Sequence, residues 1–157
     1  MKKQLDVTQD KSNIDLGMVI PGDPKAQKRH RYRRQGNRII SYDPSSAEKK
    51  TVATIMRSMW SKHPLKGAIS VAITLHCKRP KSHYRTGRNS HLLKGSVPVV
   101  KITKPDIDNY VKFYMDCGKD ILWRDDSQVI RLEAWKVYED EQGPRTEMEV
   151  WEVDGDA

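Results

Sequence analysis

The residues best suited to chemistry lie in one segment, residues 104–126, which reads KPDIDNYVKFYMDCGKDILWRDD. It holds two acidic pairs with a lysine between them: Asp106 and Asp108, Lys112, and Asp125 and Asp126. Mg²⁺ prefers carboxylate and water oxygens, so all four acids are candidate metal ligands. An ion held there would offset the negative charge that develops during phosphodiester hydrolysis, and it would lower the pKa of a water molecule. Lys112 would supply fixed positive charge beside the phosphate.

The charge along the chain favours an anionic partner. The formal net charge is +8 and the pI is about 9.5. Residues 1–105 carry +17, residues 106–157 carry −9, and residues 49–105 contain no Asp or Glu. A positive field of this kind attracts nucleic acid. An ordinary solvated surface with an uneven charge distribution is the alternative interpretation.

Two basic runs, residues 25–34 and residues 78–94, are candidate phosphate-binding segments. Lysine and arginine at such positions contact the DNA backbone without reading its sequence. Tyr84 lies within the second run and could stack on an unpaired base, although a half-buried structural tyrosine is an equal alternative. The predicted DNA-binding residues are Lys25, Lys28, Arg29, Arg31, Arg33, Lys78, Arg79, Lys81, Arg85 and Arg88.

A helix is expected to position the first acidic pair. Pro105 suits a first helical turn. Asp108, Lys112 and Asp116 follow at steps of four and share one face, whereas Ile107, Val111, Tyr114 and Met115 are expected to face the core. Asp106 and Asp108 are two residues apart, so they converge only if Asp106 lies at or before the start of the helix.

The second acidic pair precedes a predicted strand, and the turn around it could return Asp125 and Asp126 to the same place as the first pair. The alternative is purely structural. In that case Asp106 and Asp108 would only favour the positive end of a helix, and Asp125 and Asp126 would only form a turn.

The pattern of apolar residues predicts an α/β fold: a mixed sheet of about five or six strands with two main helices. A single domain should span residues 16–153, after a frayed N-terminus at residues 1–15. Besides the helix after Pro105, a helix is expected from Pro44 to about Ser61, and residues 78–103 should form a long loop. A turn at 140–144 should join the last two strands into a hairpin. The expected strands are 16–20, 38–42, 68–77, 129–138 and 145–153.

Composition also excludes several classes of protein. Cys77 and Cys117 are far apart and form no CxxC pair, which indicates buried core thiols in a reducing compartment. The N-terminus has no apolar signal region, and no stretch approaches the ~20 apolar residues of a membrane span. We therefore expect a cytoplasmic protein without a membrane partner or a small-molecule cofactor.

The segment resembles the signature of the RusA family of Holliday junction resolvases, in which D-x-D-N-x-x-K is followed some twenty residues later by W-x-D-D-x-Q. The matching stretches are residues 106–112 and 123–128. Residues 22–29 and 78–84 also resemble early family segments, so the similarity covers most of residues 16–152. Residues 117–120 depart from the D-A-L-N-G-like sequence of many members, which should alter a turn and leave the chemistry unchanged.

This resemblance implies a Mg²⁺-dependent endonuclease, with Mn²⁺ able to substitute, that acts as a homodimer on four-way DNA junctions. Each subunit would nick one strand, in a bacterial cell or a phage-infected host. Asp106, Asp108 and Asp126 match the metal-binding acids of the family, Lys112 matches its catalytic lysine, and Asp125 is the neighbouring acid. Two alternatives stay open: a catalytically silent basic DNA-binding module, and a nuclease for flaps or forks.

Overall fold

The computed structural model describes residues 16–153, and the predicted frayed segment at residues 1–15 lies outside them. The described part contains a four-stranded mixed sheet, a separate two-stranded ribbon and two α-helices, which confirms the predicted α/β class. The elements follow in the order β1 (Leu16–Pro21), β2 (Arg31–Gln35), β3 (Arg38–Tyr42), α1 (Ser46–Met59), β4 (Ala68–Cys77), α2 (Ile107–Gly118), β5 (Val129–Tyr138) and β6 (Arg145–Val153).

The main sheet has the strand order β1-β6-β4-β5. β4 is parallel to β5 and antiparallel to β6, and β6 is antiparallel to β1. The predicted C-terminal hairpin is therefore wrong, because β4 lies between β5 and β6. The turn at 140–144 passes the end of β4 to connect β5 with β6, and β5 forms an edge of the sheet.

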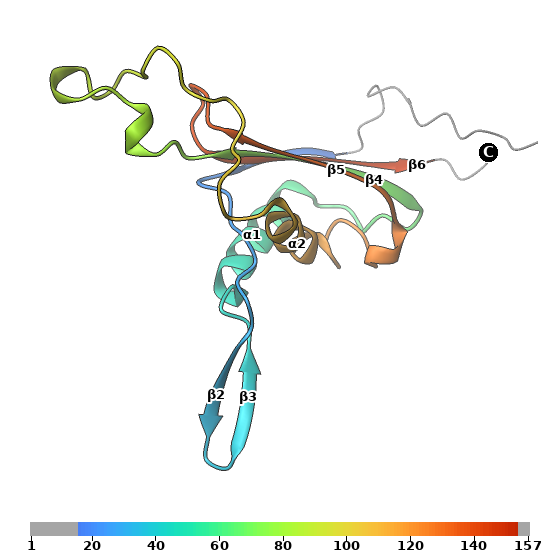
Figure 1. Ribbon diagram of the computed structural model, residues 1–157. Helices are drawn as coiled ribbons and strands as arrows, with labels where there is room; N and C mark the ends of the chain where they lie inside the picture. Colours follow the sequence, from blue (N-terminus) through green and yellow to red (C-terminus); the bar gives the residue numbers. More distant parts are fainter. Residues whose placement is uncertain (1–15, 154–157) are drawn as a thin grey trace, which may run out of the picture.

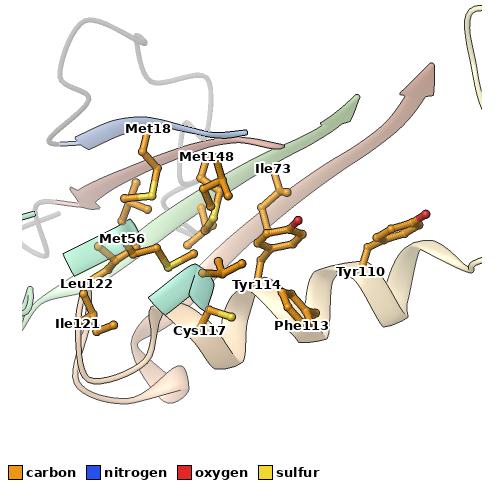
Figure 2. Packing of buried hydrophobic residues seen from close by; sticks show 14 of the residues in the cluster. Met18, Met56, Ile73, Tyr110, Phe113, Tyr114, Cys117, Ile121, Leu122 and Met148 are labelled. Carbon is orange, nitrogen blue, oxygen red and sulfur yellow. The ribbon is translucent and has the colours of Figure 1, made fainter. Parts of the chain in front are cut away.

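Both helices pack on one face of this sheet (Figure 1). The side chains of Met18, Ile73 and Met148 from the sheet meet Met56 of α1 and Tyr114 of α2 (Figure 2). These five residues are at least 96% buried, and burial of apolar area on this scale is the main force that fixes the helices in place.

The buried face of α2 differs from the prediction. Tyr110, Phe113, Tyr114 and Cys117 are buried, whereas Ile107 is 39% exposed. The helix is thus rotated so that its aromatic residues meet the sheet. Asp108 and Lys112 remain exposed on the outer side, as a site on this helix requires. Cys77 and Cys117 are both free and buried, as predicted.

Two segments extend from the layered body (Figure 1). The β2–β3 hairpin projects beyond the helical layer, and all its residues except Ile40 are exposed. The long segment between β4 and α2 extends from one end of the sheet. It contains the short 3₁₀ helices η2 (Lys81–His83) and η3 (Gly87–Asn89). In residues 16–153, no helix has the length and apolar character needed to cross a bilayer.

Candidate active site

Asp106 and Asp108 lie at the start of α2 in the arrangement expected for two converging carboxylates. Asp106 is the N-cap residue, with an extended backbone (φ −72°, ψ 150°), and Asp108 is in the first helical turn. The Asp106 side chain makes no capping hydrogen bond to the helix; it forms an ion pair with Lys104 (Nζ–Oδ2 2.8 Å). Pro105 therefore precedes the cap and lies outside the first turn. Both acidic side chains are exposed to solvent.

The Lys104 ammonium lowers the pKa of the Asp106 carboxyl below its usual value, mainly through their hydrogen bond. Asp106 is thus an anion at any pH near neutrality, and the ionised form of a carboxyl group is the one that binds a hard cation. A cation can displace the Lys104 ammonium from this carboxylate, because the lysine side chain is 85% exposed. The Asp106 carboxylate is therefore both ionised and accessible.

The turn that carries Asp106 is held by two lysines that sequence analysis did not identify. Lys136 Nζ on β5 donates to the carbonyl oxygens of Thr103 and Pro105, both at 2.8 Å. Lys101 Nζ donates to Thr103 O and to the carbonyl of Lys104. Burial lowers the pKa of Lys136, and the nearby Lys101 charge lowers it further. No sequence motif signals contacts of this kind, since they join an ammonium group to backbone carbonyls.

Lys112 is exposed one helical turn after Asp108 and lies on the same side of α2. Asp116, the third residue on this side of the helix, forms an ion pair with α1. Lys49 Nζ of α1 contacts Asp116 Oδ2 at 2.7 Å and Asp43 Oδ2 at 2.8 Å. Asp116 therefore joins the two helices. Asp108 and Lys112 remain available for a ligand.

The second acidic pair lies on a turn in which Asp125 has a structural role. The carboxylate of Asp125 accepts hydrogen bonds from the Asp126 backbone N–H (2.9 Å) and from Ser127 Oγ (2.7 Å), and the Ser127 bond is the main reason that its pKa is lowered. It caps the 3₁₀ helix η4 (Asp126–Gln128). The structural alternative for this acid is thereby supported.

Asp126 is held differently, because its Oδ1 accepts a 2.9 Å hydrogen bond from the buried Trp123 indole. Gln128 fixes the same turn through its side-chain amide. Its Oε1 accepts from the backbone N–H groups of Arg124 and Asp125, and its Nε2 donates to Leu65 O and Gly67 O. The W-x-D-D-x-Q pattern thus describes one rigid turn that presents the carboxylate of Asp126.

The two acidic pairs lie at opposite ends of α2. Asp106 caps the N-terminus, whereas Asp125 contacts Lys119, the C-cap residue, at 3.6 Å. Trp123 packs against Gly118 so closely that a Cβ there would lie 2.5 Å from the indole ring. A helix of 12 residues is about 18 Å long. The expected meeting of both pairs within one chain is therefore not found, and residues 16–153 contain no group of three metal-ligating side chains.

The first basic run lies against the α2 end that carries Asp106 and Asp108. The backbone N–H of Gln27 donates to Asn109 O (2.9 Å), and that of Lys25 donates to Tyr114 Oη (3.0 Å). From there the chain enters the β2–β3 hairpin with Arg31 and Arg33 exposed. Lys28 is exposed but 3.5 Å from Glu48, and Arg29 is exposed as well. The sugar-phosphate backbone of a DNA strand bound along this run would pass beside Asp106 and Asp108.

The second basic run begins close to the first, because the Lys78 backbone N–H donates to Asp23 Oδ1 (2.8 Å). Arg79 has a structural role: its guanidinium bonds Glu139 O and Pro98 O and lies over the Tyr138 ring (5.4 Å). Tyr84, the candidate stacking residue, is half-buried. The predicted phosphate contacts Lys81, Arg85 and Arg88 are exposed.

Comparison with known proteins agrees with this arrangement. The family profile described as "Endodeoxyribonuclease RusA" matches residues 21–151. The chain belongs to the RusA family. It is also 30% identical over 140 residues to the uncharacterised protein YqaN of Bacillus subtilis (strain 168), a match that covers 88% of this chain and 96% of YqaN.

The RusA match spans both signature stretches, and the fold explains why they occur together. The D-x-D-N-x-x-K stretch forms the cap and first turns of α2, and the W-x-D-D-x-Q stretch forms the turn after its C-terminus. In this RusA chain α2 separates them as a rigid spacer. Two carboxylates therefore face the basic segments at one end, and a third is oriented at the other.

Proposed function

We propose that the protein is a Mg²⁺-dependent endonuclease that resolves four-way DNA junctions as a homodimer, with one nick from each subunit. Membership of an endodeoxyribonuclease family supports the reaction class. One structural observation carries the proposal further. Asp106 and Asp108 are exposed at the N-terminus of α2, with Lys112 one turn away and the first basic run bonded to the same turn at Asn109.

The donor set fits a magnesium ion. Mg²⁺ is commonly held by one or two carboxylates, with water and substrate phosphate oxygens filling the other positions. Asp106 and Asp108 supply two hard oxygen donors, and neither carboxylate is buried or bonded to the helix that carries it. Mn²⁺ prefers the same ligands and should substitute. A bound ion would stabilise the charge of the reacting phosphate and lower the pKa of a water.

The chain's own groups then have separable tasks. Asp106 and Asp108 hold the ion. Lys101 and Lys136 donate to the backbone carbonyls of residues 103–105 and keep the Asp106 turn in place. Lys112 places permanent positive charge beside the scissile phosphate. Asp126 is an oriented carboxylate that is available for a further ligand role, whereas Asp125 maintains the turn. Preorganised charge of this kind costs no rearrangement during the reaction.

The substrate follows from the distribution of positive charge. The hairpin and the segment after β4 extend from the body at different places (Figure 1), so one subunit can contact phosphates well apart from each other. Paired nicks in opposed strands of a four-way junction require two active sites related by symmetry, which a two-fold dimer supplies.

One panel of substrates tests this proposal. A four-way junction, a fork, a flap and a linear duplex of matched length should be cleaved under one salt condition, with Mg²⁺ and with EDTA. Salt must be constant because it changes the affinity of basic proteins for DNA by orders of magnitude. The junction should be cut fastest, in symmetric pairs, and only with the metal. Faster cleavage of the fork or flap would indicate a nuclease for other branched DNA, and binding without any cleavage would indicate a silent binding module.

A further inference from the structure

The segment between β4 and α2 carries an arm, residues 81–94, that extends from one end of the sheet (Figure 1). At the base of this arm a pocket of about 270 Å³ lies against the turn that follows β5. A cavity of about 150 Å³ can hold a benzene ring, so this pocket has room for a single nucleobase. Six residues line it: Arg79, Tyr84, Leu93, Glu139, Asp140 and Glu141.

The apolar part of the pocket is built by Tyr84 and Leu93, which lie opposite each other in a short antiparallel ladder. Backbone hydrogen bonds of 2.8 and 2.9 Å join residues 83–85 to residues 92–94 on both sides of this pair. Side chains directly opposite each other in such a ladder point to the same side and lie close together. The Tyr84 ring and the Leu93 side chain therefore form one continuous apolar wall.

The polar part of the pocket offers one available acceptor and one available donor. Glu139 Oε1 already accepts from the Arg79 backbone N–H (2.7 Å). Asp140 already holds the Arg145 guanidinium through both oxygens (2.7 and 3.0 Å). Glu141 is exposed, and within residues 16–153 no group donates to its carboxylate. Arg79 donates through Nε and Nη1, whereas its Nη2 meets no acceptor among the described residues.

Positive charge surrounds the pocket on the side of the arm. Residues 78–94 contain six lysines and arginines and no acid, and Lys81, Arg85 and Arg88 among them are exposed. A DNA strand whose phosphates contact these residues would bring its bases against the apolar wall. Basic residues beside an aromatic surface are typical of proteins that bind single-stranded nucleic acid, whereas the core of a protein–protein interface is depleted of charge. The charges therefore favour a nucleobase as the occupant.

We propose that this pocket takes one unpaired nucleobase of the bound DNA, stacked on Tyr84, with its Watson–Crick edge toward Arg79 and Glu141. This inference rests on the proposed function, because it takes branched DNA as the ligand. On this edge adenine and cytosine carry an amino group beside a ring nitrogen that accepts hydrogen bonds. The amino group donates to Glu141, and the ring nitrogen accepts from Arg79 Nη2. Thymine has no amino group, and guanine presents a ring N–H where Arg79 requires an acceptor.

The pocket lies close to the candidate active site. Lys136 on β5 donates to the carbonyl of Pro105, the residue before Asp106, and Glu139 follows Lys136 by three residues. Three residues of a strand span about 10 Å, and a stacked DNA strand advances about 3.4 Å for each nucleotide. The captured base should therefore lie about three nucleotides from the scissile phosphate.

Capture of an unpaired base also favours branched DNA over linear duplex. Drawing a base out of a stacked duplex costs free energy, and this cost is smallest where the base is already unpaired. Base pairs open more readily at a branch point than inside a continuous duplex. The pocket thus adds affinity for branched DNA that a linear duplex of the same charge does not gain.

Four-way junctions that carry one abasic nucleotide test the pocket. The abasic nucleotide is moved through each position near the cut, and affinity is measured in EDTA so that no cleavage occurs. At one position the wild type should bind about tenfold more weakly, the loss expected for one stacked base. Tyr84→Leu should bind the intact junction about tenfold more weakly and should not respond to the abasic nucleotide, because both changes remove the same contact. Equal abasic losses in the two proteins would overturn the proposal.

The identity of the base at that position tests the polar edge. Each of the four bases is placed opposite an abasic nucleotide, so that none has a pairing partner. The wild type should bind adenine or cytosine about tenfold more tightly than thymine. Glu141→Ala, a change in an exposed turn, should bind the four bases alike. A preference that survives this change would contradict the assigned contact.

Leu93→Ala supplies a second variant of the apolar wall, and Leu92→Ala is its matched control. Leu92 is 41% exposed and Leu93 is 38% exposed, but adjacent residues of a strand point to opposite sides. Only Leu93→Ala should weaken binding of the intact junction and reduce the abasic effect. Equal losses of affinity in both variants would show that the arm contacts DNA without the pocket.

Binding without metal separates this inference from the nuclease proposal. If the wild type cuts no DNA in Mg²⁺, the nuclease proposal fails, and the titrations in EDTA still decide whether the pocket holds a base. If the wild type cuts the junction but no abasic position lowers its affinity, the pocket proposal fails and the nuclease proposal stands.

Discussion

The indole Nε1 of Trp123 donates a 2.9 Å hydrogen bond to Oδ1 of Asp126. Trp123 is fully buried and packs on Gly118, so its position is fixed by the end of α2. The bond leaves the second carboxylate oxygen of Asp126 available for a ligand. A buried donor that orients an exposed carboxylate is the arrangement found around metal-binding acids.

Trp123→Phe should therefore reduce Mg²⁺-dependent nicking by about tenfold, because it removes the donor and keeps an aromatic ring in place. Smaller volume and one lost hydrogen bond should also lower the free energy of unfolding by about 1–3 kcal/mol. Trp60→Phe is the matched control, since Trp60 is also buried and its indole donates to His63 O. Equal losses of nicking in both variants, measured at the same fraction folded, would show that stability alone is responsible.

Asp108→Asn should lower junction cleavage by more than about 100-fold, because it removes a proposed direct ligand of the ion. Loss of a direct ligand should reduce activity more than loss of a group that only supports a ligand. Binding to the junction, measured in Ca²⁺ or EDTA, should stay the same or tighten since one negative charge is lost. Asp120→Asn serves as the control: Asp120 has a positive φ of 66°, a conformation that asparagine also tolerates. Full cleavage by the Asp108 variant would remove this residue from the site.

Lys136→Met tests the positioning of Asp106. Loss of the bonds to Thr103 O and Pro105 O should loosen the turn, and the resulting misplacement of a ligand should reduce the rate by about 10–100-fold. The Mg²⁺ concentration needed for half-maximal rate should rise, while the affinity for DNA changes little. Lys66→Met, at an exposed lysine before β4, controls for the loss of one positive charge. A variant that loses DNA affinity and keeps its Mg²⁺ dependence would identify Lys136 as a phosphate contact.

Local patterns in the sequence predicted the elements well, and the reasons are visible in the structure. β4, β5 and β6 have the bounds that alternation indicated. β4 and β6 each carry one buried side and one more exposed side, whereas most of β5 alternates between half-buried and exposed residues. Strand order was not predictable in this way. The short turn at 140–144 favoured a hairpin, but β4 lies between β5 and β6 and pairs with both. No local pattern in the sequence predicts that β4 separates these two strands.

The candidate site shows the same limit. Identity and spacing indicated the acids and Lys112, but closeness in sequence between the two acidic pairs suggested closeness in space. The intervening residues form one straight helix, which keeps the pairs about 18 Å apart in a single chain. The supporting contacts of Lys101, Lys136 and Gln128 end on backbone carbonyl and amide groups. Any residue type provides those groups, so no pattern could reveal them.

Acid should destabilise the fold through Asp43. Partial burial disfavours the charge of this carboxylate, but bonds from Lys49, the Ser45 backbone and Gln27 outweigh that cost and hold its pKa at about 2. A pKa below the unfolded value of 3.8 stabilises the protein above pH 4, and this stability is lost as the pH falls through about 2. Asp43 should contribute about 2 kcal/mol of the decrease between pH 4 and pH 2.

Chemical denaturation at several pH values measures this contribution. Asp43→Asn should lower the free energy of unfolding at pH 7 and flatten its decline below pH 4. Lys49→Met removes the ionic partner of both Asp43 and Asp116 and should flatten the same part of the curve. An unchanged slope in both variants would assign the acid sensitivity to other carboxylates, such as Asp140, whose pKa Arg145 holds at about 2.

The β2–β3 hairpin should supply much of the affinity for DNA without reading its sequence. Arg31, Arg33 and Arg34 are exposed on β2, and Tyr32 beside them is 72% exposed. Replacing the three arginines with alanine should weaken junction binding and reduce the slope of log K against log salt by up to about 3, one unit for each lost phosphate contact. Thermal stability should change little, because the hairpin lies outside the buried core. Replacing Lys50, Arg57 and Lys62 on and after α1 removes the same charge from another exposed surface. If that control lowers the slope equally, binding depends on net charge alone and the hairpin has no particular place in the DNA interface.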